Sequence, residues 1–425
     1  MKFISHPNPE SWKTLLKRPS IDHSNVEMIV RPILEKVKNN GDEAIREFTY
    51  QFDKIRLDGL QVDEYQISQA AQKIPPELKK AIQTAAENIK KFHQSQVEKE
   101  NKIETMPGVV CWRKSVAIEK VGLYIPGGTA PLFSTVLMLG IPAMIAGCHE
   151  IILCTPPDKD GEIHPSILFA AHYVGINKIF KVGGAQAIAA MAYGTETIPK
   201  TYKIFGPGNQ FVTVAKQLVN NEGTSIDMPA GPSELAVLAD SSCNPAYIAA
   251  DLISQCEHGK DSHVLLVSDN SEVIKKVNEE IKTQLDAIVR REMTQTSLQN
   301  SLSILVNSLE EGIDLINEYA PEHLVLQVEN VRIVGNRIIN AGSVFLGNYS
   351  LVAAGDYASG TNHTLPTNGY AKTFSGVSID SFVKKITFQE LSKLGFDNIA
   401  ETIEVMSEAE GLLGHKESVT RRRSD

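Results

Sequence analysis

An amide and an imidazole near the end of one predicted helix are the first candidates for chemistry. Gln255 and His258 are three positions apart in the helix predicted from Pro245 to His258, so both project from one face. An amide oxygen and a neutral imidazole can each ligate a divalent metal ion, but two ligands do not make a site. A histidine that interacts with its own helix C-terminus is the simpler interpretation of this pattern.

The adjacent pair Glu322 and His323 is the second candidate. It follows Pro321 in a loop and precedes a strand predicted at 324–326. A carboxylate and an imidazole in a loop can supply a base and a water-activating group, although such neighbours also occur without function. A third candidate is the segment 355–363, GDYASGTNH, which concentrates more polar side chains between glycines than a solvated loop requires.

Four small, polar loops follow predicted strands directly: PGGT (126–129), GGAQ (183–186), GPGN (206–209) and Gly347-Asn348. In open α/β sheets, ligands bind beyond the carboxyl ends of the strands. No GxGxxG fingerprint is present, because position 211 is Phe where the third glycine would follow Gly206 and Gly208. Gly183-Gly184 could still present free N–H groups to a pyrophosphate, with close strand–helix packing as the alternative.

The elements that must position these residues alternate between strand and helix from Val116 onward. Strands are predicted at 116–125, 151–154, 178–182, 202–205, 235–238, 264–267, 303–306, 324–326 and 343–346. Helices are predicted between them, over residues 26–98, and alone beyond Ser381. Such alternation is typical of βαβ units and parallel sheets.

The predicted fold is therefore α/β, with two incomplete Rossmann-like parallel-sheet modules, a helical N-terminal segment and a small helical C-terminal tail. We expect residues 1–115 to pack with residues 236–380 as one module. Residues 116–235 are expected to form the second module, and residues 381–425 the tail.

The composition limits the compartment and the partners. The 425 residues include 42 Lys and Arg against 51 Asp and Glu, a net charge of -9, which disfavours nucleic acid as a partner. The longest apolar stretch, 134–147, contains Pro142 and is too short to cross a bilayer. Five cysteines without a CxxC pair suit a reducing compartment. We expect a cytoplasmic protein without a membrane partner.

From about residue 25 to residue 420, the chain resembles the histidinol dehydrogenase family. The resemblance rests on seven strings in order: VGLYIPGGTAPLFSTVLML, KVGGAQAIAAMAYGTE, KIFGPGN, DMPAGPSE, SQCEHG, APEHL and GDYASGTNHTLPT. One short string would be a weak signal, whereas seven in sequence are specific.

The resemblance implies an NAD-dependent enzyme that oxidises L-histidinol to L-histidine through histidinaldehyde, the last step of histidine biosynthesis, with one zinc ion per subunit. It implies Gln255, His258, Asp356 and His415 as zinc ligands, and Glu322 and His323 as the catalytic pair. It implies NAD contacts by Tyr124, Gln186 and Asn209, and substrate contacts by Ser233, Glu410, His323 and the zinc ligands.

The resemblance also implies a homodimer in which the C-terminal tail of one subunit completes the site of the other. By themselves, Glu410 and His415 would be interpreted as residues of an exposed, polar tail; in such a dimer they would be site residues. Cys256 stands where relatives often have Ala. It lies about 200° around the helix from His258, so we expect it to pack rather than ligate.

Other functions remain open on the sequence. Cys148 or Cys154 could form a thiohemiacetal with an aldehyde. Cys148 is expected just before a strand, at the sheet edge opposite the ligands, and Cys154 has no nearby basic activator. A related dehydrogenase could act on another small hydroxy compound. A zinc-dependent hydrolase and a non-enzymatic binding protein are the alternatives from other classes.

Overall fold

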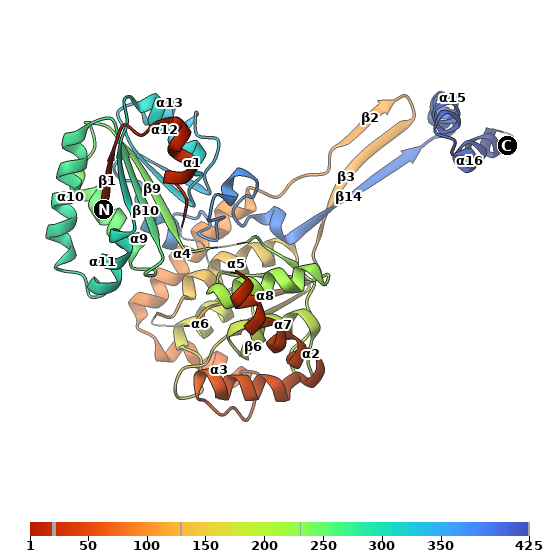
Figure 1. Ribbon diagram of the computed structural model, residues 1–425. Coiled ribbons are helices and arrows are strands. Elements are labelled where there is room, and N and C mark those ends of the chain that lie inside the picture. Colours follow the sequence, from red (N-terminus) through yellow and green to blue (C-terminus); the bar gives the residue numbers. More distant parts are fainter. Residues whose placement is uncertain (19–22, 128–129, 230, 424–425) are drawn as a thin grey trace. The chain divides into compact units, whose positions relative to one another are not determined.

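The computed structural model of the chain describes residues 1–18, 23–127, 130–229 and 231–423. The chain divides into two units, and each is described by itself (Figure 1). The first unit comprises Met1–Gln96 and Ile118–Ser381. The second comprises Val97–Ala117 and Phe382–Asp425. The chain therefore leaves the first unit, enters it again and leaves it a second time.

One parallel sheet of the first unit, here called sheet B, has five strands within the described residues. Its spatial order is β6-β5-β4-β7-β8. The strands are β4 (Lys120–Tyr124), β5 (Glu150–Thr155), β6 (Lys178–Lys181), β7 (Lys203–Phe205) and β8 (Ser225–Ile226). The connecting helices are α5 (Phe133–Ala146), α6 (Pro165–Tyr173), α7 (Gly184–Tyr193) and α8 (Gln210–Asn221). The strand order reverses between β4 and β7, as it does in dinucleotide-binding folds.

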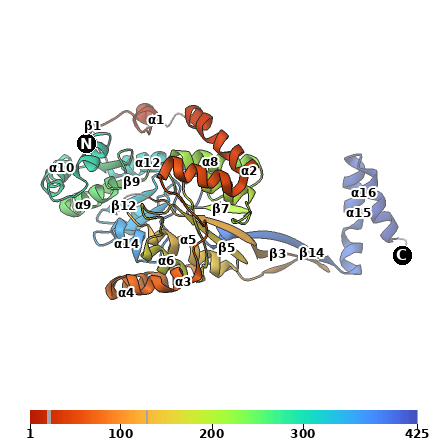
Figure 2. The same cartoon turned by 90° about the horizontal axis from the view of Figure 1, so that it is seen from below.

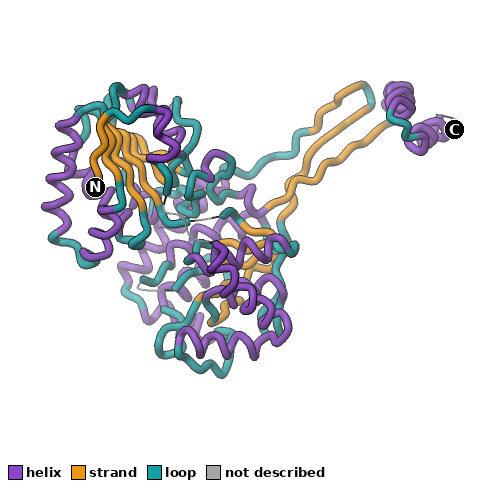
Figure 3. The backbone as a smooth tube through the Cα atoms, in the orientation of Figure 1, coloured by secondary structure: helices purple, strands orange, loops and turns teal. Residues whose placement is uncertain are grey.

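The second parallel sheet of this unit, sheet A, has the order β1-β11-β10-β9-β12-β13 over the described residues. Its strands are β1 (Lys2–Ser5), β9 (Glu234–Ala239), β10 (His263–Ser268), β11 (Leu302–Leu305), β12 (His323–Gln327) and β13 (Ser343–Leu346). The helices between them are α9 (Pro245–Cys256), α10 (Ser271–Leu285), α11 (Arg291–Gln299), α12 (Leu309–Tyr319) and α13 (Val331–Gly335), and α14 (Val352–Tyr357) follows β13. Figure 3 shows helices on both sides of these strands. From β9 onward the order repeats that of sheet B, and β1 is added at one edge.

The N-terminal helices pack mainly with the sheet B module. They are α2 (His23–Asp53), which breaks at Gly41 as the sequence predicts, α3 (Glu64–Gln69) and α4 (Pro76–Gln94), after the short α1 (Trp12–Leu15). Val30 and Ile45 of α2 share a hydrophobic core with Ile188 of α7. β1 and α1 lie with sheet A, in line with the predicted grouping of residues 1–115 with residues 236–380, whereas α2, α3 and α4 pack on the other module. An amphipathic pattern defines the apolar face of a helix but not the surface that covers it.

The second unit contains an antiparallel sheet that the sequence analysis does not predict. It is formed by β2 (Lys102–Met106), β3 (Val109–Ala117) and β14 (Val383–Leu391) in the order β14-β3-β2. Beyond β14, the helices α15 (Lys393–Ala409) and α16 (Leu413–Arg423) pack side by side (Figure 2). The prediction of helices alone beyond Ser381 is therefore wrong for β14.

The predicted fold class is confirmed by the two parallel sheets, the helical N-terminal segment and the C-terminal helices. The buried strands are predicted best: residues 264–267 lie within β10, and residues 324–326 lie within β12. Across the described ranges, no helix combines the length and the apolar character needed to cross a membrane.

Candidate functional site

A cavity of about 830 Å³ lies at the carboxyl edge of sheet B. Tyr124 ends β4, Gln186 lies in the first turn of α7, and Asn209 precedes α8; all three line this cavity. The cavity thus extends over the carboxyl ends of β6, β5 and β4 and reaches the start of α8, next to the point where the strand order reverses. The structure brings together the three residues predicted to contact NAD.

The walls of this cavity are formed partly by backbone that only glycine allows. A Cβ atom on Gly183 would lie 2.5 Å from the Cβ of Pro156, and Gly184 has a φ of 66°. The N–H of Gly184 donates to the hydroxyl oxygen of Tyr124 at 3.0 Å, and burial raises the pKa of Tyr124 to about 12. Asn209 accepts two backbone N–H groups as the N-cap of α8. Gly128 and Thr129 of the predicted PGGT loop lie outside the described residues.

Asp53, the last residue of α2, also lines the cavity, and no sequence motif indicates it. Its Oδ2 atom is buried and has no hydrogen-bond partner among the described residues, and burial raises the pKa of this carboxyl group. A carboxylate at the end of an amphipathic helix carries no sequence signal for a ligand. Asp53 is recognised as a cavity residue only from the structure, in which α2 borders the cavity.

A second set of predicted residues gathers at the amino edge of sheet A. A helix in a βαβ unit runs antiparallel to the strands, so Gln255, in the last turn of α9, lies close to where β10 begins. The helix ends at Cys256, two residues earlier than predicted, and His258 follows it. Glu322 and His323 lie at the start of β12, on the same edge, and Asp356 on α14 reaches His323. The residues predicted to contact NAD thus lie at the carboxyl edge of sheet B, whereas the predicted catalytic pair lies at the amino edge of sheet A. The predicted loop Gly347-Asn348 follows β13 and lies at the opposite edge.

Glu322 and His323 are both almost fully buried and both are held by the backbone of Glu234. The N–H of Glu234 donates to Oε2 of Glu322 at 2.7 Å. The carbonyl oxygen of Glu234 lies 3.1 Å from Nδ1 of His323, so that nitrogen carries the hydrogen. The Nε2 atom of His323 lies 3.6 Å from Oδ1 of Asp356 and has no hydrogen-bond partner within the described part of the chain.

Opposite charges compensate one another in this buried cluster. Burial lowers the pKa of His323, but the carboxylates of Glu322 and Asp356 outweigh it and raise the pKa to about 10. Burial raises the pKa of Asp356, but His323, His363 and His258 outweigh that effect and lower it. The sequence places His363 in the polar segment 355–363 but does not predict that it lies near Asp356.

The orphaned polar atoms beside this cluster fit a bound cation. Both side-chain polar atoms of Gln255, and Nε2 of His363, are buried without a hydrogen-bond partner in the described ranges. Leaving such groups unsatisfied costs roughly 1–3 kcal/mol each, which a ligand would offset. An amide oxygen, an imidazole and a carboxylate are donors that zinc accepts. Among the residues described, no group of three or more His, Cys, Asp or Glu could hold a metal by itself.

The remaining predicted residues divide between the two units. Ser233, in the first unit, is half-buried and its carbonyl oxygen accepts the N–H of His263 at 3.1 Å. Glu410 and His415, in the second unit, flank the turn between α15 and α16, and both are exposed. The predicted zinc ligands of the first unit are thus Gln255, His258 and Asp356.

The two cysteines considered for a thiohemiacetal are not activated thiols. Cys256 is fully buried in the core of the sheet A module, as the sequence predicts. Burial raises the pKa of Cys148 to about 12 and raises that of Cys154 as well. Both thiols remain protonated at neutral pH, which disfavours the thiohemiacetal alternative.

Comparisons with known proteins agree on one family. The model of the family described as histidinol dehydrogenase matches residues 16–423. Histidinol dehydrogenase of Bacteroides thetaiotaomicron is 57% identical over 422 residues, which cover 99% of this chain and 99% of that protein. The Salmonella typhimurium protein of the same name is 47% identical over 418 residues, covering 98% and 95%. The crystal structure of histidinol dehydrogenase from Elizabethkingia anophelis has a TM-score of 0.98 and 51% identity, covering 100% of this chain and 98% of that one.

Proposed function

The chain belongs to the histidinol dehydrogenase family, and we propose that it catalyses the zinc-dependent, NAD-linked oxidation of L-histidinol to L-histidine. The four-electron reaction would pass through histidinaldehyde, as the last step of histidine biosynthesis. The observation that carries the proposal is the unpartnered buried amide of Gln255, on the same edge of sheet A as the Glu322–His323 pair.

Four side chains would hold the metal ion. Gln255, His258 and Asp356 come from the first unit, and His415 would come from the tail of a second subunit. When bound, zinc supplies a Lewis-acid centre that holds the amine and imidazole nitrogens of histidinol. Ser233 and Glu410 would contact the remaining polar groups of the substrate. Holding the substrate at several points fixes the alcohol carbon for hydride transfer.

His323 would act as the base in the first oxidation. Its Nδ1–H is held by Glu234, so Nε2 is the atom that takes the hydroxyl proton. Asp356 is one of the two carboxylates that raise the pKa of His323, the other being Glu322. As a metal ligand, Asp356 would support the imidazolium less.

Glu322 would take part in the second oxidation. Its carboxylate is oriented by the N–H of Glu234 and lies 3.5 Å from Nδ1 of His323. From this position it can accept a proton from the water molecule that adds to the aldehyde. Retention of the aldehyde in the site protects it from side reactions in solvent.

The cavity on sheet B would bind the dinucleotide. NAD+ supplies the hydride acceptor in each of the two oxidations. Tyr124, Gln186 and Asn209 line the cavity, and α7 directs the positive end of its dipole toward it. The half-buried carboxyl group of Asp53, whose Oδ2 atom has no hydrogen-bond partner among the described residues, would favour hydroxyl donors, such as those of a ribose, over the additional phosphate of NADP+.

Membership of this family also supports a homodimer and a location in the cytoplasm as parts of the proposal. A homodimer in which each tail completes the other subunit's site would bring Glu410 and His415 into use. The cysteines Cys111, Cys154, Cys243 and Cys256 are free thiols. Free thiols suit the reducing cytoplasm, where we place the enzyme.

One measurement tests the reaction: the yield of NADH from zinc-loaded protein, excess NAD+ and limiting L-histidinol. Two NADH for each histidinol are expected. One NADH for each histidinol would contradict the four-electron reaction. No NADH would favour a hydrolase, a binding protein or a dehydrogenase of another hydroxy compound.

A further inference from the structure

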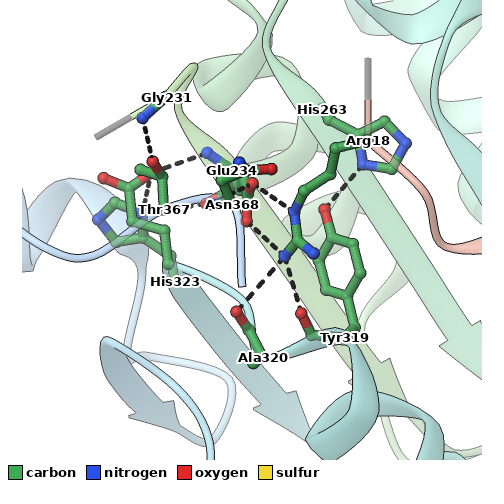
Figure 4. A network of polar contacts seen from close by, with 10 residues as sticks. Arg18, Gly231, Glu234, His263, Tyr319, Ala320, His323, Thr367 and Asn368 are labelled. Atoms are coloured by element: carbon green, nitrogen blue, oxygen red, sulfur yellow. Dashed lines mark hydrogen bonds and ion pairs between the residues drawn. The ribbon is translucent and has the colours of Figure 1, made fainter. Parts of the chain in front are cut away.

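Arg18 and Glu234 form a buried ion pair next to the proposed catalytic pair. Nε of Arg18 lies 2.5 Å from Oε1 of Glu234, and Nη2 lies 2.8 Å from Oε2 (Figure 4). The two side chains are only 13% and 3% exposed. The N–H of Asn368 also donates to the Glu234 carboxylate, at 2.8 Å. The two-point contact between the Arg18 guanidinium and the Glu234 carboxylate fixes the orientation of the carboxylate as well as its position.

The same guanidinium contacts the segment that leads into Glu322. Nη2 of Arg18 lies 2.8 Å from the carbonyl oxygen of Tyr319 and 3.4 Å from that of Ala320. The guanidinium carbon also lies 3.9 Å from the centre of the Tyr319 ring. Ala320 ends α12 with a φ of 51°, a left-handed conformation that is unfavourable for alanine. Arg18 therefore holds the backbone just before Glu322 in an unusual conformation.

Arg18 thus contacts both structures that meet at the catalytic pair. One is the start of β9, which carries Glu234, and the other is the connection from α12 to β12, which carries Glu322 and His323. The two strands pair in parallel, with His323 opposite Leu235. The backbone of Glu234 bonds to Glu322 through its N–H and to His323 through its carbonyl group.

We propose that Arg18 and Glu234 are positioning residues for the Glu322–His323 pair, acting through the Glu234 backbone and the Tyr319–Ala320 connection. The inference rests on the proposed function, because it assumes that this pair reacts with the substrate. Neither Arg18 nor Glu234 needs to touch the substrate. Without Arg18, the Glu234 carboxylate would be buried near that of Glu322 without its cation, and the backbone between them would move.

The variants Arg18→Met and Arg18→Lys separate positioning from simple stabilisation. Arg18→Met removes the guanidinium, whereas Arg18→Lys keeps the charge but not the two-point contact. We expect Arg18→Met to lower kcat about a hundredfold, Arg18→Lys to lower it less, and the KM for NAD+ to stay within about twofold. Arg31→Met is the matched control, because Arg31 forms an exposed ion pair with Glu27 on α2.

A spectroscopic measurement reports on His323 without relying on turnover. In protein labelled with nitrogen-15 histidine, the His323 side-chain signals are assigned with His323→Gln and compared among the variants. We expect these signals to shift in Arg18→Met and in Glu234→Gln, and to stay unchanged in Arg31→Met.

The possible results are distinct. Wild-type kcat and wild-type His323 signals in Arg18→Met, with only a lower melting temperature, would show that the pair is purely structural and would overturn the inference. Arg18→Met could fail to fold. In that case, a wild-type kcat and unshifted His323 signals in Arg18→Lys and Glu234→Gln would overturn the inference. If the wild-type protein yields no NADH from histidinol, the proposed function fails, while shifted His323 signals would still support positioning.

Discussion

The carbonyl oxygen of Glu234 accepts the Nδ1–H of His323 at 3.1 Å, and this bond selects the tautomer of the imidazole. A carbonyl oxygen can only accept, so the hydrogen lies on Nδ1 and the lone pair of the neutral ring lies on Nε2. The Nε2 atom is the one directed toward Asp356. The proposed base and the proposed metal ligand therefore face each other.

Replacing His323 by Gln should remove the base and keep a side chain that can bond to Glu234. We expect kcat to fall by about 10²–10⁴-fold, the usual contribution of a general base. The affinity for NAD+, measured by calorimetry, should not change, because the cavity that we assign to NAD+ lies on sheet B. A loss of less than about tenfold would show that another group accepts the proton.

Removal of the metal should abolish turnover, and added zinc should restore it. Gln255→Ala should weaken zinc binding by at least about tenfold, measured by competition with a coloured chelator. The control is Gln299→Ala, at an exposed position on α11. Equal zinc affinity in Gln255→Ala and the wild type would exclude the amide as a ligand.

Co-expression of His415→Ala and His323→Ala chains tests whether tails are exchanged. Each variant alone should be inactive. Random pairing of the two chains should restore about a quarter of the wild-type activity, because one site in each mixed dimer has both residues. Mixed dimers that recover nothing would show that each tail completes its own subunit's site or none.

Asp53→Asn should reduce the preference for NAD+ over NADP+. A like charge close to the additional phosphate costs about 1–4 kcal/mol, depending on the local dielectric. Calorimetric titration of both dinucleotides measures the change directly. Asp58→Asn serves as the control, because Asp58 is exposed and does not line the cavity. An unchanged ratio of the two affinities in Asp53→Asn would rule out this role.

His263 should make stability depend on pH. Burial, with the charge of Arg18, lowers the pKa of His263 to about 4, and Nδ1 of His263 is 2.8 Å from the Tyr319 hydroxyl. In the unfolded chain, where the pKa of a histidine is ~6.5, His263 is protonated at a higher pH than in the folded protein. The associated stability is present above that value and is lost between about pH 6.5 and 4, on the order of 3 kcal/mol in total.

His263→Gln should remove this dependence. Between pH 7 and pH 4 its melting temperature should fall less than that of the wild type, whereas the exposed His149→Gln should follow the wild type. Parallel curves for all three proteins would mean that His263 is not held neutral.

The sequence predicts the strands of the parallel sheets because these are short, continuous apolar runs between turn residues. β14 is missed because its sequence, VKKITFQEL, mixes charged and apolar residues and most of it is exposed. Its partner β3 lies far away along the chain, so nothing local indicates the pairing. A strand whose order depends on a distant partner cannot be recognised from its own residues.

The sequence likewise predicts some parts of the candidate site and not others. The strand-end rule leads to the cavity on sheet B. On sheet A it leads to the edge opposite the residues that we propose for the metal and for catalysis, because these lie at helix C-termini and strand starts. Arg18 and Asp53 have no motif around them. The roles that we propose for them rest only on burial and on contacts with residues far away in the sequence.

The separation of β14 from β3 also affects how the chain is made. During synthesis, the hairpin of β2 and β3 is complete while β14 is still untranslated, so the pairing edge of β3 remains open until most of the polypeptide has left the ribosome. An open strand edge can pair with another nascent chain. Neighbouring ribosomes on one message would therefore bring such edges close together, and the order in which β3 finds its partner would decide between correct assembly and aggregation.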